Sequence, residues 1–314
     1  MVTKNKVLIL APQDDAHAQD IAAYIESKEL AEVQIWDSSG FPAKQQLSFY
    51  SDSRGVVLDG VGERSIELSQ YASCWWRRPM AAEIPDDIDD PRVRNYCLIE
   101  SDRLIRGALL ASGCRLINDP LQQSMADHKP YQLKHAKALG LNIPDTLMCN
   151  DPNAVRDFVA KYKGRVVFKA FHSPSWRIVE TREWSEELNE DLQTLKYAPV
   201  IFQELIDLGR DVRVTVIGDQ VFAAEVSSRS EVAYLDWRLD TSVQWLSISL
   251  PIELQTMIFS LMKVLGLDYG ALDFRQNSKG EWVFLEINPS GQFLFMEDRD
   301  TYNLRHAFTQ LLLS

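Results

Sequence analysis

Two acidic residues and an amide fall in a part of the chain that is otherwise apolar. The strand expected from Trp282 to Ile287 is apolar on both faces, which is typical of a buried strand, yet it contains Glu286. Asn288 lies two residues later and points to the same side, and the preceding strand from Tyr269 to Phe274 contributes Asp273. A lone buried carboxylate is costly, so something must offset its charge. This oxygen set predicts a Mg²⁺ site, and a structural ion pair with a nearby Arg or Lys is the alternative.

The net charge of the chain opposes any polyanionic ligand. The 33 Lys and Arg against 45 Asp and Glu give −12, so neither nucleic acid nor an anionic membrane surface is expected as a partner. A triphosphate would need a local cluster of cations or a metal ion. Lys169 ends an apolar strand and Lys129 opens a helix, which makes both lysines candidates for phosphate binding. The alternative for each is a lysine that only solubilises a surface or protects a strand edge.

A strand end that combines polar and apolar residues is suited to hold a nucleobase. Its backbone groups could clamp an adenine, and the residues concerned are Gln203, Glu204, Leu205 and Ile206. Farther along, Asp211 is placed to accept bonds from ribose hydroxyls, and Arg213 to face a phosphate or a substrate carboxylate. An internal Asp–Arg salt bridge at the start of this strand is the alternative.

The elements that must position these residues form α/β and α+β units. Residues 1–120 alternate short strands and helices, which predicts an open α/β domain. Residues 121–207 read as a small α+β module with an acidic helix near 185–195. Residues 208–314 contain further strands, a hairpin turn at 217–220 and helices at 252–265 and 304–313.

The cysteines and the hydropathy pattern bear on location. No run of 18 or more apolar residues occurs, and the chain begins directly with a strand-like stretch. The four cysteines are 23, 17 and 35 residues apart, which matches neither a zinc-ligand pair nor a disulfide framework. We therefore expect free thiols in a reducing cytoplasm and no membrane association.

In chain order, the candidate residues resemble the nucleotide- and metal-binding series of ATP-grasp ligases. The series covers about residues 120 to 295 and consists of Lys129, Lys169, Gln203, Glu204, Asp211, Arg213, Asp273, Glu286 and Asn288. The resemblance implies an ATP-grasp fold behind an N-terminal α/β pre-ATP-grasp domain. It also implies that the lysines contact ATP phosphates, that residues 203–206 line the adenine and Asp211 meets the ribose. Two Mg²⁺ ions would be bound by Asp273, Glu286 and Asn288.

One segment departs from the pattern of that superfamily. The loop after Lys169 is glycine-rich in many ATP-grasp enzymes, whereas here it runs Phe171-His-Ser-Pro-Ser-Trp176. The hydroxyl groups of Ser173 and Ser175, or backbone amides, are the candidates for phosphate contacts.

Four longer motifs are similar to those of the microviridin-type graspetide synthetases: Cys74-Trp-Trp-Arg-Arg-Pro79, Tyr197-Ala-Pro-Val-Ile-Phe-Gln-Glu204, Leu235-Asp-Trp-Arg238 and Glu286-Ile-Asn-Pro-Ser-Gly-Gln292. Those enzymes close ω-ester or ω-amide macrocycles in a ribosomal precursor peptide. The resemblance implies that a side-chain carboxylate of the peptide becomes an acyl phosphate at the expense of ATP, and that a Ser or Thr hydroxyl or a Lys amine then displaces the phosphate. It also implies a homodimer.

Several charged residues are candidates for contacts with such a peptide. Arg213 is the first candidate to steady its carboxylate and Arg238 the second, because a guanidinium can hold a carboxylate with two parallel bonds. Arg77 and Arg78 are further candidates; their alternative role is to pack on Trp75 and Trp76 and to tie the first unit to the others. By resemblance, the leader segment of the peptide docks near Glu186, Glu187, Glu190 and Asp191, which could also form only a solvated face.

Two other functions use the same residues. One is an ATP-grasp ligase that adds an amino acid, such as glutamate, to a peptide or protein. The other is a nucleotide-binding scaffold or regulator without turnover, although the full set of candidate lysines, carboxylates and amide favours an enzyme.

Overall fold

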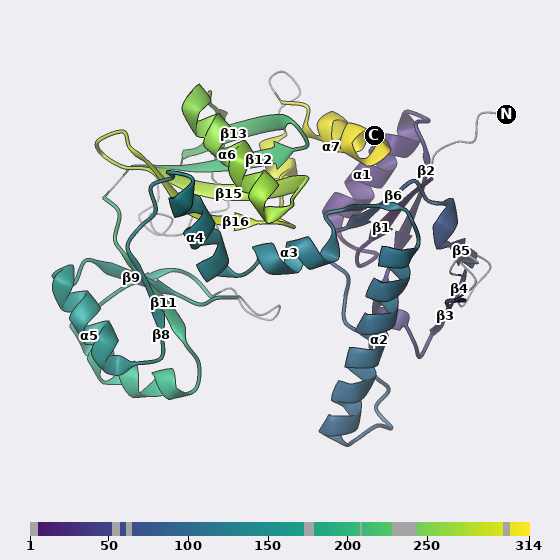
Figure 1. Cartoon of the computed structure of the whole chain (residues 1–314), viewed down its shortest axis with the longest axis horizontal. Helices are drawn as coiled ribbons and strands as arrows, with labels where there is room; N and C mark the ends of the chain where they lie inside the picture. Colours follow the sequence, from purple (N-terminus) through teal and green to yellow (C-terminus); the bar gives the residue numbers. More distant parts are fainter. Residues whose placement is uncertain are drawn as a thin grey trace.

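The computed structural model describes residues 6–51, 57–60, 65–172, 179–207, 209–227, 244–297 and 302–314. A parallel sheet lies on one side of the molecule and two antiparallel sheets on the other, and α3 (Pro120–Ala126) runs between them (Figure 1). Among the described residues, no helix combines the length and the apolar character needed to cross a membrane.

The first unit is an α/β layer, as expected. Its parallel sheet has the order β2-β1-β6-β7, and a small antiparallel sheet β3-β4-β5 lies beside it. Long α2 begins at a proline, with Asp90 accepting a hydrogen bond from the backbone of Arg92 as its cap. The elements are β1 (Lys6–Leu10), α1 (Ala16–Ser27), β2 (Glu32–Trp36), β3 (Gln45–Ser48), β4 (Val57–Gly60), β5 (Ser65–Glu67), β6 (Ser73–Trp76), α2 (Pro91–Ala111) and β7 (Arg115–Ile117).

The second unit is a four-stranded antiparallel sheet of order β10-β9-β11-β8. Helix α5 packs Val155 and Val159 against this sheet, beside Val166 and Phe202. Lys169 ends β9 and Lys129 begins α4, so both lysines occupy the element ends that the sequence predicted. The elements are β8 (Thr146–Cys149), α5 (Pro152–Lys161), β9 (Val166–Lys169), β10 (Arg182–Glu183) and β11 (Val200–Glu204). Helix α4 (Lys129–Ala138) precedes them in the chain but packs on the third sheet.

The expected acidic helix near 185–195 is not an α-helix. The chain forms two 3₁₀ turns instead, at Glu186–Asn189 and Asp191–Lys196. In an α-helix, Glu186 would face Glu190, and Glu187 would face Asp191. Like charges at this spacing destabilise a helix, which is consistent with the observed break.

The third unit is a five-stranded antiparallel sheet of order β14-β13-β12-β15-β16. Helices α4 and α6 cover one face, where alternate residues such as Val212, Leu272 and Phe284 form the core. Because side chains alternate along a strand, the residues between them point to the opposite face, toward the second unit. The elements are β12 (Arg210–Ile217), β13 (Gln220–Ser227), β14 (Gln244–Ser247), α6 (Ile252–Leu265), β15 (Tyr269–Gln276) and β16 (Trp282–Asn288).

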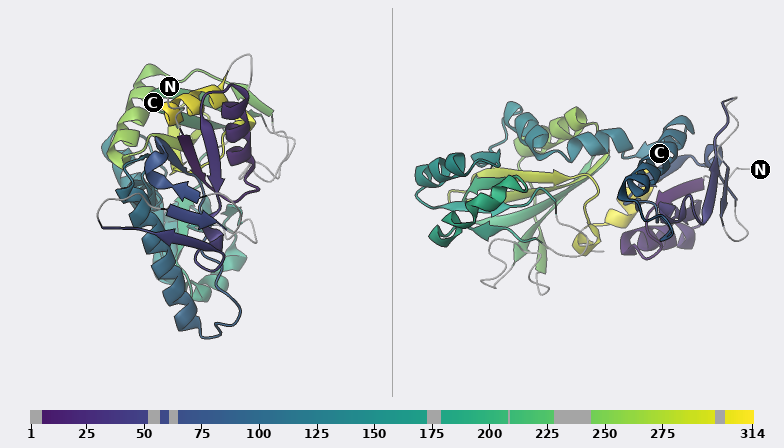
Figure 2. Two further views of the ribbon diagram at one scale, coloured as in Figure 1. Left: turned by 90° about the vertical axis from the view of Figure 1, so that its right-hand side faces the viewer. Right: turned by 90° about the horizontal axis from the view of Figure 1, so that it is seen from below.

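The last helix departs from the expected division of the chain. Helix α7 (Leu304–Leu313) belongs by sequence to residues 208–314, yet it lies beside α1 and the first sheet (Figure 2). Its Phe308 is fully buried and packs 4.5 Å, between ring centroids, from Trp75 of β6. The first and third units therefore share one hydrophobic core.

His17, at the start of α1, makes stability depend on pH. Its Nε2 accepts hydrogen bonds from the backbone N–H groups of Phe293 and Leu294, each at 3.1 Å. Burial, followed by the charge of Arg77, lowers the pKa of His17 to about 4 from the ordinary value of 6.5. Between pH 6.5 and about pH 4, His17 is protonated in the unfolded chain but neutral in the folded one, so protonation favours unfolding. The contribution of His17 is complete above pH 6.5 and is lost as the pH falls to about 4.

We expect this group to account for up to about 3 kcal/mol of unfolding free energy across that interval. Urea denaturation at pH 7 and pH 5 should show a smaller loss for His17→Gln than for the wild type. The exposed His306 supplies the control, because His306→Gln should keep the wild-type difference. Equal losses in wild type and His17→Gln would contradict the assignment.

Candidate nucleotide and metal site

The face of the third sheet that lacks helices carries the predicted carboxylates. Asp273 of β15 pairs directly with Glu286 of β16, and a bulge leaves Leu285 as an extra residue. Bulges of this kind redirect side chains and are common beside active sites. Here Leu285, Glu286 and Asn288 all line one cavity. The local pattern that the sequence predicted thus becomes a cluster between two strands.

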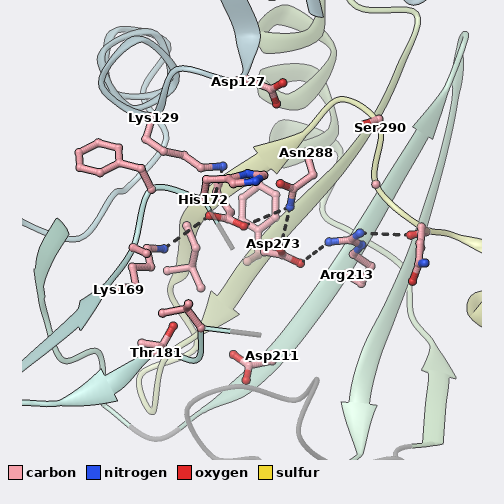
Figure 3. A pocket seen from close by; sticks show the side chains of 18 of the residues that line it. Asp127, Lys129, Lys169, His172, Thr181, Asp211, Arg213, Asp273, Asn288 and Ser290 are labelled. Carbon is pink, nitrogen blue, oxygen red and sulfur yellow. Dashed lines mark hydrogen bonds and ion pairs between the residues drawn. The ribbon is translucent and has the colours of Figure 1, made fainter. Parts of the chain in front are cut away.

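Two lysines from different elements contact the same carboxylate oxygen. Lys129 Nζ lies 3.3 Å and Lys169 Nζ 3.6 Å from Glu286 Oε2. Lys169 reaches toward the cluster from the end of β9 in the second unit, and Lys129 from the start of α4, which packs on the third sheet (Figure 3). Burial opposes the charged form of Glu286, but Lys169 and Lys129 outweigh it and hold its pKa below the usual value. Thus the phosphate-binding and metal-binding candidates form one site, and the ion pair considered as an alternative is also present.

Arg213 neutralises the second carboxylate. Its Nη1 donates to Asp273 Oδ1 at 2.8 Å, and its Nη2 donates to the backbone oxygen of Gln292 at 3.1 Å (Figure 3). Burial and the nearby charge of Glu286 raise the pKa of Asp273, while Arg213 acts in the opposite direction. Arg213 is itself buried beside the cavity. It is therefore placed to stabilise negative charge at this point.

Asp211 forms a salt bridge with a residue that the sequence analysis missed. Arg275 of β15 donates from Nε and Nη2 to its two carboxylate oxygens, at 2.7 and 2.9 Å. An Asp–Arg salt bridge was the alternative considered for this segment, but Arg275 was not named as a partner. The available signal was that Arg275 follows Asp273 by two residues and so shares its face.

A cavity of about 430 Å³ opens between the units, within the size range of small-molecule sites. All three units contribute to its wall. Besides the cluster, the lining includes Asp127 and His172, which were not assigned roles from the sequence, and Arg78 of the first unit. Burial raises the pKa of Asp127. In the described part of the chain, the guanidinium of Arg78 has no hydrogen-bonded partner.

The residues expected to line adenine lie outside the cavity that contains the cluster. Gln203 is buried, and its Nε2 donates to Thr146 Oγ1 at 3.0 Å. A carboxylate oxygen of Glu204 accepts from the backbone of Asp145 at 3.0 Å. Glu204, Leu205 and Ile206 border a second cavity, of about 550 Å³. Their contact with adenine stays a prediction.

The two consecutive arginines that follow β6 have different surroundings. Arg77 is fully buried, and its Nη1 donates to the backbone oxygens of Ser290 and, at 3.2 Å, Gly291. It also lies over the ring of Trp75, with Cζ 5.5 Å from the centroid. These contacts correspond to the tying role considered for Arg77, whereas Arg78 is exposed at the cavity.

The remaining candidates lie outside this cluster. Four acidic residues on the 3₁₀ turns are exposed, so they are accessible to a partner: Glu186, Glu187, Glu190 and Asp191. Three others fall outside the described residues, namely Ser173, Ser175 and Arg238.

The donor chemistry of the cluster fits Mg²⁺. Asp273 and Glu286 supply carboxylate oxygens on one wall, and the described residues include no larger group of His, Cys, Asp or Glu suited to a metal. Asn288 donates from Nδ2 to Glu286 Oε1 at 3.1 Å, so a half-turn of its amide would present the oxygen. Asp273, Glu286 and Asn288 are therefore the side chains suited to hold a Mg²⁺ ion.

Comparisons with solved structures give the same architecture. The macrocyclase MdnC from Microcystis aeruginosa, bound with the precursor peptide MdnA, is 28% identical, with a TM-score of 0.87 over 98% of this chain and 99% of that chain. An ATP-grasp ligase associated with ribosomal peptides from Chryseobacterium gregarium, in complex with ADP and a leader and core peptide, is 28% identical, with a TM-score of 0.85 over 98% and 96%. The macrocyclase MdnB from M. aeruginosa is 30% identical, with a TM-score of 0.80 over 98% and 99%.

Comparisons with curated proteins and with family models add two findings. Among curated proteins, human N-acetylaspartylglutamate synthase A is 22% identical over 257 residues, 77% of this chain and 62% of its own length. The chain thus spans less than two thirds of that relative. Residues 6–124 match the MvdD pre-ATP grasp domain, and residues 126–310 match the RimK-like ATP-grasp domain. The chain belongs to the RimK-like ATP-grasp family and carries a pre-ATP-grasp domain of the MvdD type in front of the ATP-grasp fold.

Proposed function

We propose that this chain is an ADP-forming ligase that closes macrocycles in a ribosomal precursor peptide. It would activate Asp or Glu side chains of the peptide and join them to Ser or Thr hydroxyls as esters or to Lys amines as amides. The observation that carries the proposal is the cluster in which Lys129 and Lys169 meet Glu286 beside Asp273. The solved macrocyclases, similar over nearly the whole chain, support the peptide substrate.

The phosphates of the nucleotide would lie in the cavity that contains the cluster, and its base would reach toward the second cavity. Lys129 and Lys169 would exchange part of their contact with Glu286 for the phosphates, while Gln203, Glu204, Leu205 and Ile206 face the adenine and Asp211 the ribose. Asp273, Glu286 and Asn288 would hold two Mg²⁺ ions. When bound, Mg²⁺ neutralises phosphate charge and orients the transferring group. Ser173 and Ser175 belong to the proposed phosphate contacts.

The reaction divides into two displacements. An oxygen of the peptide carboxylate attacks the γ-phosphorus of ATP, and the bond to the leaving ADP breaks, which gives an acyl phosphate. A hydroxyl or amine of the same peptide then attacks the acyl carbon, loses its proton and releases phosphate. Arg213 would stabilise the charge of the first displacement, with Arg238 as a second contact. Because both reacting groups belong to one bound peptide, their proximity lowers the entropic cost.

The peptide would enter from the side where the first unit meets the cavity. Arg78 has a free guanidinium there, among the described residues, and would hold a peptide carboxylate, whereas Arg77 supports the wall behind it. The exposed acidic residues Glu186, Glu187, Glu190 and Asp191 would dock a partly basic leader segment. We further propose a homodimer acting in the reducing cytoplasm, where the four cysteines, free in the structure, stay reduced.

A second function has support from the human relative, whose name describes a glutamate-containing product. Addition of an amino acid to a peptide or protein would use the same nucleotide and metal residues. The two reactions differ in mass balance. Cyclisation removes one water per bond formed, whereas ligation adds the mass of a residue.

Macrocyclisation can be tested by mass spectrometry with ATP, Mg²⁺ and a candidate precursor. Short open reading frames beside the gene, with repeated Thr and Glu or Asp, supply the peptides. We expect losses of water that depend on ATP and that disappear in Glu286→Gln and Asp273→Asn. A gain of residue mass would select the second function, and water loss without ATP would contradict both.

The lysine contacts predict opposite effects on two ligands. In Lys129→Met, Glu286 loses a neutralising cation, so Mg²⁺ alone should bind more tightly by calorimetry. ADP in the presence of Mg²⁺ should bind about tenfold more weakly, because one charge-assisted phosphate contact is lost. Lys134→Met on the same helix is the control, since Lys134 is exposed. Unchanged binding of ADP to Lys129→Met would exclude the phosphate role.

If the leader segment docks at the 3₁₀ turns, reversing the acidic charges there should weaken binding of the precursor peptide. Glu190→Lys with Asp191→Lys should weaken binding of a labelled precursor by about tenfold in fluorescence anisotropy, because attraction becomes repulsion. The control reverses another exposed acidic pair, Asp86 and Asp87, which precedes α2. Equal effects of the two double variants would attribute the change to net charge instead of a docking site.

A further inference from the structure

The segment Pro289–Leu294 connects the metal-binding candidate Asn288 to the rest of the chain. Its residues Ser290, Gly291 and Gln292 form part of the cavity wall. The segment lies at the end of β16 and contains no strand, so no sheet ladder supports its backbone. Backbone polar groups that are buried must find other partners. Some are backbone groups of adjacent turns, as when the Gly291 N–H donates to the Asn288 oxygen at 3.1 Å. The other partners among the described residues are side chains, and most of them come from the first unit.

Arg77 contacts the middle of this segment and His17 contacts its end. Arg77 donates to the backbone oxygens of Ser290 and Gly291, and its own Nε lies 3.4 Å from Asp15, the cap residue of α1. His17, two residues after Asp15, accepts from the backbone N–H groups of residues 293 and 294. Side chains at the start of α1 and directly after β6 therefore fix the backbone of the segment by hydrogen bonds.

Asn118 secures the beginning of the segment. It follows β7, and its amide makes four hydrogen bonds in a buried setting. Nδ2 donates to the backbone oxygens of Pro289 and Tyr269 at 2.9 and 2.8 Å, while Oδ1 accepts from the N–H groups of Asp268 and Tyr269, both at 2.9 Å. One side chain of the first unit thus connects the start of β15 to the turn that follows β16.

The packing leaves the segment no room to shift independently of the site. A Cβ on Gly291 would lie 2.5 Å from the Cβ of Ala271 and 2.8 Å from Nη2 of Arg213, so only glycine fits there. The hydroxyl of Tyr269 donates to the Gly291 oxygen at 2.5 Å. Arg213 in turn donates to the backbone of Gln292. A shift of the segment backbone would therefore displace the side chain of Arg213 and the neighbouring residue Asn288.

We infer that Arg77, His17 and Asn118 are positioning residues: through the Pro289–Leu294 segment, the first unit sets the geometry of Asn288 and Arg213 for binding Mg²⁺ with the nucleotide. This inference rests on the proposed function, because it concerns the same site. Groups that orient a metal ligand without touching the metal commonly alter metal affinity by about 10–100-fold. The first unit would then act on the cofactor site as well as on the peptide.

The test measures ADP binding by calorimetry at a series of Mg²⁺ concentrations. Arg77→Met should raise the Mg²⁺ concentration for half-maximal ADP binding by about tenfold. Arg77→Lys keeps one charged donor and should restore part of the difference. His17→Leu leaves two backbone N–H groups without an acceptor and should shift the Mg²⁺ dependence in the same direction. If Arg77→Met does not fold, the Mg²⁺ dependence of ADP binding to His17→Leu tests the inference.

Ser73→Ala is the matched control. Ser73 begins β6, the strand that Arg77 follows, and donates to the backbone of Leu312 in α7, at 2.5 Å, but in the described part of the chain no hydrogen bond joins it to the segment. It should lower the melting temperature and keep the wild-type Mg²⁺ dependence. Folded Arg77→Met or His17→Leu with wild-type dependence would overturn the inference, as would an equal shift in Ser73→Ala. Absence of ADP binding in the wild type would instead reject the nucleotide site and the proposed function.

Discussion

The central constraint on this structure is the placement of two carboxylates opposite each other on neighbouring strands. Asp273 and Glu286 are cross-strand partners at the wall of a cavity, where like charges repel strongly. Three cations compensate: Lys129 and Lys169 at Glu286, and Arg213 at Asp273. The pKa of Glu286 falls and that of Asp273 rises, so the pair is not equivalent. A site of this kind requires positive charge from a ligand or from the protein at all times.

This requirement explains why the site lies where separate units meet. Lys129 comes from the start of α4, Lys169 from the end of β9 and Arg213 from β12, and no single unit contains all three. In the proposed complex, a divalent ion and the phosphates of the nucleotide would replace these contacts, because an ion supplies positive charge to the carboxylates and phosphates supply negative charge to the lysines. The protein-only ion pairs and the proposed ligand contacts are therefore alternatives for the same atoms.

The first unit is joined to the third sheet by both apolar packing and hydrogen bonds. Helix α7 returns to pack with α1 and β6, and the buried side chains of Arg77 and Asn118 bond to the backbone after β16. Apolar packing supplies the adhesion, and the hydrogen bonds specify the geometry. The pre-ATP-grasp domain thereby packs and bonds directly with the part of the chain that carries the proposed metal ligands.

The sequence by itself determined the local features: the strand around Glu286, the ends of elements at Lys129 and Lys169, and the shared face of Glu286 and Asn288. These follow from periodicity and capping, which depend on near neighbours in the chain. Tertiary structure decided which charges pair. Asp211 meets Arg275 across the sheet because directly opposed residues lie closer than residues two apart on one strand. It also separated Arg77 from Arg78, burying the first and exposing the second at the cavity. Strand order, the return of α7 and these pairings arise from contacts between distant segments, which local sequence patterns do not encode.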